Sequence, residues 1–256
     1  MASFEEELQI LQPVIQKLCD ISLFGKKVII KGRQHFVREG PNIIIGNHCG
    51  SYKDVAILMK YVPRPIFFTA NVGIFNRSEF NALVRKHLKR HMHNFGLFLD
   101  LLFSPIKAPF VDYISSNIYK VGTIPVDLNH KKRMAFRLCH DYLKKGKAII
   151  TLQGRGRVYS DHPHPYIYPF RRGASILAYN LFRDDKVKVP ITPVAFYGTQ
   201  TPLIVPGKIK VNVGEPMYIV DYLTGETSKT IMDFKDALEN RVKALFYDIV
   251  KKKEAD

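Results

Sequence analysis

The sequence predicts an α/β fold, a single domain with a mostly parallel central sheet flanked by helices. Short apolar runs typical of strands alternate along the chain with stretches whose apolar residues have helical spacing. Some runs, such as NIIIG at 42–46, are continuously apolar, as in strands that are buried on both faces of a parallel sheet. No linker rich in Pro, Gly or Ser divides the 256 residues, so one domain over residues 1–256 is expected.

The first half of the chain is expected to contain an N-terminal helix, four strands and a helical insertion. Residues 3–23 carry apolar side chains three and four apart, which predicts an amphipathic helix that Pro13 kinks or splits. A second helix is predicted at 52–62, since Pro63 follows it. Residues 73–118 are interpreted as an insertion of two or three helices. Strands are predicted at 26–32, 34–37, 42–48 and 66–70.

The second half continues the alternation of strands and helices. A basic amphipathic helix at 131–145 ends at Gly146, and a helix near 230–252 closes the chain. Another helix is predicted at 173–183. The strands of this half are predicted at 122–126, 147–152, 189–198 and 208–214.

The chain is strongly basic, with 39 Lys and Arg against 23 Asp and Glu and a net charge of +16. This charge predicts an anionic partner, which is a nucleic acid, an anionic membrane surface, or a phosphorylated or thioester-carrier substrate. No zinc-finger, homeodomain or RNA-recognition signature is present, so a nucleic acid is disfavoured. Three widely spaced cysteines favour a reducing compartment, and no secretory signal or membrane-spanning run is visible. We therefore expect a cytoplasmic protein that is peripheral on the inner face of a membrane.

The first candidate site follows the buried strand at 42–48, because sites in open α/β sheets lie at the carboxyl ends of strands. His48 ends this strand, and Asp54 falls on the first turn of the next helix. If the carboxylate reaches one imidazole nitrogen, the other nitrogen can act as the base that deprotonates a hydroxyl. Ser51 and Asp54 also have a spacing close to that of a helix-capping box, and a cap alone would explain both. Cys49 is disfavoured as a nucleophile, because adjacent residues on an extended chain point apart.

A second candidate site is TLQGRGR at 151–157, again at the end of a predicted strand. Gly154 and Gly156 allow the backbone to approach a ligand closely. Arg155 and Arg157 offer planar guanidinium groups to phosphate or carboxylate oxygens. A glycine-rich surface turn would have the same pattern.

Further basic residues surround these candidates. Arg171 and Arg172 precede the helix at 173–183 and could close the same pocket, although a solvated basic surface is the alternative. His87 and His91 have one of the spacings of metal ligands, but lysines and arginines surround them, so no metal is expected. A basic face for anionic lipid headgroups fits this stretch better.

Two segments are candidates for membrane docking, the N-terminal helix at 1–23 and the stretch 85–103, in which basic residues precede apolar ones. The alternative is that the apolar residues are core beneath a basic helix. The docking residues predicted in 85–103 are Arg85, Lys86, Lys89, Arg90, Phe98 and Phe103.

Six motifs, in order over roughly residues 25–220, resemble the glycerolphosphate and lysophosphatidate acyltransferase family. IIIGNHCGSYKDVAIL resembles its Asn-His-x-Ser-x-x-Asp block, and VGTIPVD resembles the second block. TLQGRGR resembles the third block, usually Pro-Glu-Gly-Thr-Arg, and VPITPVAF resembles the fourth. FRRGASILA resembles the family's Phe-Lys-x-Gly helix start, and VNVGEPMYI resembles its Gly-x-Pro-Ile strand.

The resemblance implies an O-acyltransferase of phospholipid biosynthesis, with an acyl thioester as donor and a glycerolipid precursor such as lysophosphatidate or glycerol 3-phosphate as acceptor. His48 would take the proton from the acceptor hydroxyl, and Asp54 would orient His48. No cofactor is implied, since acyl-CoA or acyl carrier protein enters as the donor substrate. The substrate-binding residues implied or predicted are Asn47, Ser51, Gln153, Gly154, Arg155, Arg157, Arg171 and Arg172.

The sequence also departs from the family pattern. Five residues separate His48 from Asp54 where the family usually has four, so Cys49 or Gly50 is expected to bulge. Gln153 stands where the third block has Glu, and Leu128 stands where an Arg often binds the acceptor's phosphate. An alternative function is therefore a catalytically degenerate relative that binds lipid or a carrier protein at the membrane surface.

Overall fold

The structure is a computed structural model that describes residues 4–49, 52–86, 104–126, 132–154, 166–201 and 205–251. The chain divides into two compact units. The larger unit contains residues 12–66 and 136–256, and the smaller contains residues 1–11 and 67–135. The single domain over 1–256 stays a prediction.

Parallel strands form most of the sheet in the larger unit, as the sequence predicts. Their order is β1-β7-β6-β2-β5. β2 pairs in parallel with both β5 and β6, β1 pairs in parallel with β7, and only the β6–β7 pair is antiparallel among these. The strands are β1 (Lys26–Lys31), β2 (Asn42–His48), β5 (Ala148–Gly154), β6 (Ile191–Tyr197) and β7 (Gly207–Val213). The predicted α/β class with a mostly parallel sheet is confirmed.

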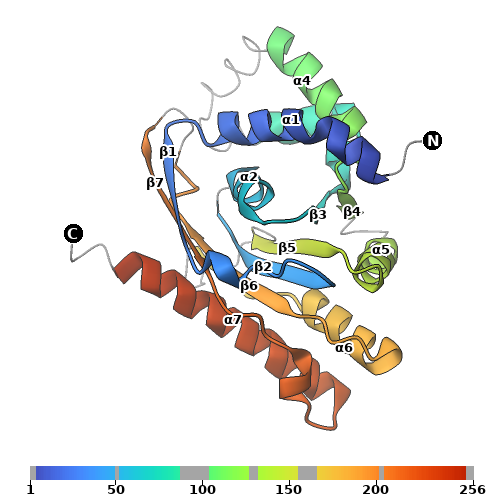
Figure 1. The fold of residues 1–256 in the computed structure, drawn as a ribbon. Coiled ribbons are helices and arrows are strands. Elements are labelled where there is room, and N and C mark those ends of the chain that lie inside the picture. The colour runs from blue at the N-terminus through green and yellow to red at the C-terminus, as the bar shows by residue number, and fades with distance from the viewer. Residues whose placement is uncertain are drawn as a thin grey trace. The chain divides into compact units, whose positions relative to one another are not determined.

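Helices cover both faces of this sheet, which is why its central strands are continuously apolar. Figure 1 shows α6 (Gly173–Asp185) and α7 (Thr227–Lys251) on one face and α2 (Tyr52–Tyr61) on the other. The first six residues of β2 and of β6 are all buried. On α7 the buried side chains recur about every four residues, as in a helix with one apolar face. They include Phe234, Leu238, Val242, Leu245 and Ile249.

The other predicted elements are also present, with one exception. Pro13 lies inside a continuous helix, α1 (Phe4–Ser22), and α5 (Lys132–Lys144) matches the predicted basic helix. The strand expected at 34–37 was wrong, because Arg33–His35 form a 3-10 turn. Gly32 adopts a φ of 74° there and turns the chain, so the strand does not continue. His35 Nδ1 instead lies 2.8 Å from the Val213 carbonyl oxygen.

The smaller unit contains a parallel pair of strands, β3 (Ile66–Asn71) and β4 (Ile124–Val126). The predicted insertion at 73–118 is helical where it is described, at 77–86 and in α4 (Ser104–Asn117). Residues 87–103 of the insertion lie outside the described residues. In the ranges that the structure covers, no helix is both long enough and apolar enough to cross a bilayer.

Glu239 on α7 fixes the segment that leads into α6. Its Oε2 accepts a hydrogen bond of 2.9 Å from the Phe170 N–H, and its Oε1 forms an ion pair of 2.7 Å with Lys243. Burial raises the pKa of Glu239, but the Lys243 ammonium and the Phe170 N–H outweigh it, so the pKa lies below its ordinary value.

We predict that Glu239→Gln lowers the free energy of unfolding by about 1 kcal/mol at neutral pH. Because the folded-state pKa is depressed, the stabilisation by Glu239 is present above the unfolded-state pKa and is lost as pH falls through the folded-state pKa. Urea unfolding of both proteins between pH 7 and pH 3 measures the difference, which should shrink at the acid end. Asp233→Asn, which changes an acid on the same helix that pairs with Lys229, is the control. A difference that does not depend on pH would contradict the prediction.

Candidate active site

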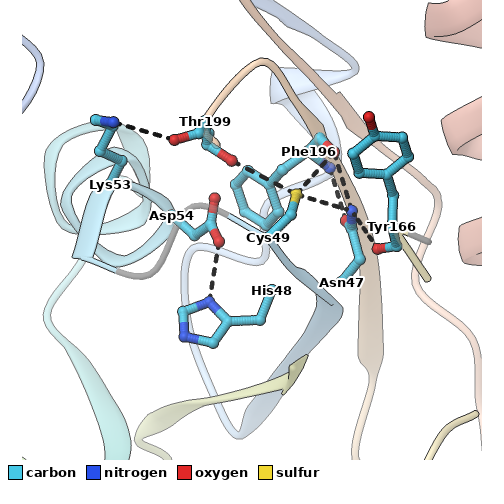
Figure 2. A network of polar contacts seen from close by, with 8 residues as sticks. All are labelled: Asn47, His48, Cys49, Lys53, Asp54, Tyr166, Phe196 and Thr199. Atoms are coloured by element: carbon cyan, nitrogen blue, oxygen red, sulfur yellow. Dashed lines mark hydrogen bonds and ion pairs between the residues drawn. The ribbon is translucent and has the colours of Figure 1, made fainter. Parts of the chain in front are cut away.

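A histidine–aspartate pair lies at the carboxyl end of β2. His48 is the last residue of this strand, and Asp54 lies in the first turn of α2. His48 Nδ1 is 2.9 Å from Asp54 Oδ2, where the Asp54 side chain is 0% exposed and the His48 side chain is 31% exposed. Figure 2 shows the second ring nitrogen of His48 facing away from Asp54. With Nδ1–H donating to the carboxylate, Nε2 carries the lone pair and can accept a proton.

The five residues between His48 and Asp54 do not prevent this contact. Gly50 and Ser51 lie outside the described residues, so the position of the extra residue and the role of Ser51 stay predictions. Helix capping alone does not account for Asp54, because its Oδ2 is bonded to the imidazole.

Asn47 fixes the end of β2 to its neighbours. The side chain is fully buried. Its Oδ1 accepts a 2.8 Å hydrogen bond from the Phe196 N–H of β6, and its Nδ2 donates to the Phe196 carbonyl at 2.9 Å and to the Tyr166 carbonyl at 3.2 Å (Figure 2). Gly46 permits the close approach of β2 and β6, since a Cβ there would collide with the Val194 carbonyl oxygen. The amide therefore holds the backbone from which His48 projects, while its predicted contact with substrate stays a prediction.

Cys49 points away from the imidazole, as expected for a neighbour on extended chain. Its Sγ lies 3.6 Å from the Phe196 carbonyl oxygen and 3.6 Å from Thr199 Oγ1, on the opposite side of the strand end from His48 (Figure 2). The thiol thus belongs to the polar network around Asn47. In this geometry His48 is not placed to activate the Cys49 thiol as a nucleophile.

The TLQGRGR motif leaves β5 beside the end of β2, which carries His48. β2 and β5 pair so that Asn47 lies opposite Gln153 and His48 opposite Gly154. Gln153 is buried, its Nε2 donates to Thr151 Oγ1 at 3.1 Å, and its Oε1 accepts a 3.1 Å hydrogen bond from the Arg171 N–H. The amide therefore joins the end of β5 to the start of α6.

Of the predicted arginines, the structure describes two. Arg171 and Arg172 are exposed and directly precede α6, where the Gln153 side chain holds the main chain. Arg155 and Arg157 lie outside the described residues. In the part of the chain that the structure covers, no three His, Cys, Asp or Glu side chains lie close enough together to hold a metal ion.

The predicted docking residues belong to the smaller unit, and two of them are described. Arg85 and Lys86 are exposed at the end of the helix at 77–86. The remaining four lie outside the described residues: Lys89, Arg90, Phe98 and Phe103.

Sequence reasoning missed Lys53. The residue is 3% exposed, and its Nζ donates to the carbonyl oxygens of Thr199, at 3.2 Å, and of Thr201. Burial, followed by the nearby Lys26, lowers the pKa of the Lys53 ammonium, and Asp54 opposes this shift. The helical spacing could have revealed that Lys53 is buried. It lies four residues before the buried Ile57 and so falls on the apolar stripe of α2.

No family model matches the chain, but two known proteins are similar to it, one in sequence and one in fold. Over 135 residues, or 52% of its length, the chain is 25% identical to the 1-acyl-sn-glycerol-3-phosphate acyltransferase of Bacillus subtilis (strain 168), and it spans 62% of that protein. Its fold is similar to the crystal structure of PlsC, the 1-acyl-sn-glycerophosphate (LPA) acyltransferase from Thermotoga maritima. The TM-score is 0.55 at 16% identity, over 96% of this chain and 84% of the other. The resemblance predicted from the motifs is confirmed, since both similar proteins are acyltransferases.

We predict that Asn47→Ala lowers the free energy of unfolding by about 2 kcal/mol or more, because it leaves buried main-chain groups of Phe196 without their partner. It should also shift the NMR resonances of the His48 ring. Asn42→Ala is the matched control, since Asn42 is buried at the other end of β2 and binds the Pro190 carbonyl and Thr192. It should destabilise comparably but leave the His48 resonances in place. Equal effects of the two variants on His48 would show that Asn47 does not position it.

Proposed function

We propose that this chain is an O-acyltransferase of phospholipid biosynthesis. It moves a fatty acyl chain from an acyl thioester to a hydroxyl of a glycerolipid precursor, such as lysophosphatidate or glycerol 3-phosphate. The observation that carries the proposal is the 2.9 Å contact between the buried Asp54 carboxylate and the partly exposed His48 ring at the carboxyl edge of the sheet. The likeness to two acyltransferases supports it.

In the proposed reaction, His48 Nε2 takes the proton of the acceptor hydroxyl as its oxygen attacks the thioester carbonyl. Asp54 stabilises the imidazolium that forms and keeps the ring oriented. The tetrahedral intermediate then expels the donor's thiolate, which receives the proton from His48. Donor and acceptor react directly, so the reaction needs no acyl-enzyme and no cofactor.

The donor is proposed to be acyl-CoA or acyl carrier protein, and both are anionic. The net charge of +16 favours such partners and an anionic membrane surface as well. We propose that Arg171 and Arg172, together with Arg155 and Arg157, bind phosphate groups of the acceptor or donor, because guanidinium groups match phosphate geometry. The exposure of Arg171 and Arg172 at the start of α6 supports this role.

A single-turnover assay with an acyl thioester and lysophosphatidate tests the proposal. His48→Ala should lower the rate by roughly 10²–10⁴, because a general base is lost. Asp54→Asn should lower it by roughly several-fold to a few thousand-fold, because the ring loses its charged partner and an amide N–H at this position favours the wrong imidazole tautomer. His140→Ala on α5 is the control, since this side chain is about as exposed as that of His48 and pairs with Asp185. If wild type and His48→Ala bind lipid but have the same rate, the chain is instead a degenerate binding relative.

We further propose that the protein binds the inner face of a membrane through the basic residues of the insertion. Replacing Arg85, Lys86, Lys89 and Arg90 with Gln should abolish binding to vesicles containing anionic lipid, since each basic residue contributes about 1 kcal/mol. High salt should have the same effect on the wild type. Flotation of the protein with vesicles measures the binding, and transfer to a short water-soluble acceptor should survive.

The control for this experiment removes the same charge from exposed lysines of the larger unit. It changes Lys186, Lys188, Lys208 and Lys229 to Gln. If the variant of the insertion binds anionic vesicles as well as the wild type does, docking is assigned to the N-terminal helix.

A further inference from the structure

A buried lysine joins the first turn of α2 to the turn that follows β6. Lys53 Nζ donates to the carbonyl oxygens of Thr199 and Thr201. The turn itself is closed by the Thr201 hydroxyl, which donates to the Gly198 carbonyl at 2.9 Å. Gly198 has a φ of 88°, and a Cβ there would collide with the Lys208 carbonyl oxygen, so the turn has little freedom to move.

The same turn also contacts the end of β2. Thr199 is fully buried, and its Oγ1 lies 3.6 Å from Cys49 Sγ, the residue next to His48. Figure 2 shows this continuous path from Lys53 through Thr199 and Cys49 to Asn47, with Asp54 and His48 beside it. The turn after β6 thus contacts both segments that carry the pair, β2 and α2.

We propose that Lys53 is a positioning residue for the His48–Asp54 pair. Its buried ammonium group holds the first turn of α2, which also carries Asp54, against the turn after β6. The consequence for catalysis rests on the proposed function, whereas the effect on the imidazole does not.

The position of this charge has a cost that an apolar side chain would avoid. Lys53 lies on the stripe of α2 that buries Ile57, and taking an ammonium group out of water is unfavourable unless it is well bonded. Two main-chain carbonyls and the ring of Tyr52, 5.3 Å from Nζ, offset part of this cost. A cation at this site therefore does more than fill space.

The electrostatic consequence has a definite sign. A nearby cation favours the charged form of a carboxylate and disfavours the charged form of an imidazole, and burial strengthens both effects. Among the described residues, Lys53 on α2 and Cys49 after β2 lie in the polar network beside the pair, whereas Lys26 on β1 reaches only the turn at 198–201. Loss of the Lys53 charge should therefore raise the pKa of His48 and leave less of it as the neutral base at a given pH.

The experiment compares four variants with the wild type by NMR titration of the His48 ring. Lys53→Met and Lys53→Gln remove the charge, and the second keeps one donor for a carbonyl if the first fails to fold. Lys53→Arg keeps the charge. Lys26→Met is the matched control, because Lys26 bonds the same turn at Thr201 Oγ1 but stands on β1, which β7 and β6 separate from β2.

We expect both neutral variants to raise the pKa of His48 by about half a unit or more. Lys53→Arg and Lys26→Met should leave it close to the wild-type value. The acid limb of the pH–rate profile should move with the His48 pKa, with kcat reduced below neutral pH and KM little changed.

The outcomes separate this inference from the proposed function. If the His48 pKa is the same in wild type and both neutral variants, Lys53 is only structural and the inference is wrong. If the pKa moves as expected but the wild type transfers no acyl group, the inference holds and the proposed function is wrong.

Discussion

The fixed end of β2 is the constraint on which the candidate site depends. His48 projects from the last position of a strand that is paired on both sides, with β5 and with β6. The residue before it, Asn47, uses both polar ends of its amide on the main chain of Phe196. Because these bonds are buried, breaking them would leave unsatisfied groups in the core, so the strand end has one favoured geometry. The Asp54 carboxylate then meets an imidazole whose backbone these bonds hold in place.

Buried side chains also hold the main chain of the segment at 166–171, which leads into α6. Three side chains from three elements bind its main chain, Asn47 at Tyr166, Gln153 at Arg171 and Glu239 at Phe170. Each is a buried polar group satisfied by a backbone partner, which is the arrangement that makes a polar network rigid. The side chains of Arg171 and Arg172 remain exposed on this fixed backbone. A rigid main chain with solvent-facing guanidinium groups suits the binding of an anionic ligand at low ordering cost.

The sequence predicted those parts of the site that local patterns encode. The apolar run before His48 indicated a strand end, and the helix start around Asp54 indicated a first turn. The alternation of strands and helices indicated a parallel sheet, in which the strand that ends in TLQG would end near His48. It did not predict partners that only the fold brings together. Lys53 meets Thr199 across 146 residues, and Gln153 meets Arg171 across 18, and no local pattern identifies either partner. The error at 34–37 has the same origin, since Gly32 turns the chain where propensity alone favoured a strand.

Two departures from the family pattern lie near the site, the extra residue between His48 and Asp54 and the glutamine at position 153, and the contacts around them explain their effects. The extra residue between His48 and Asp54 leaves the 2.9 Å contact intact, because both ends of the loop are fixed, one by Asn47 and the other by Lys53. Gln153 donates to Thr151 while it accepts from Arg171, and a carboxylate there could only accept. Gln153 also leaves the start of α6 without a negative charge from the end of β5. The departures thus leave the geometry of the pair in place, and Gln153 adds no negative charge at this edge of the sheet.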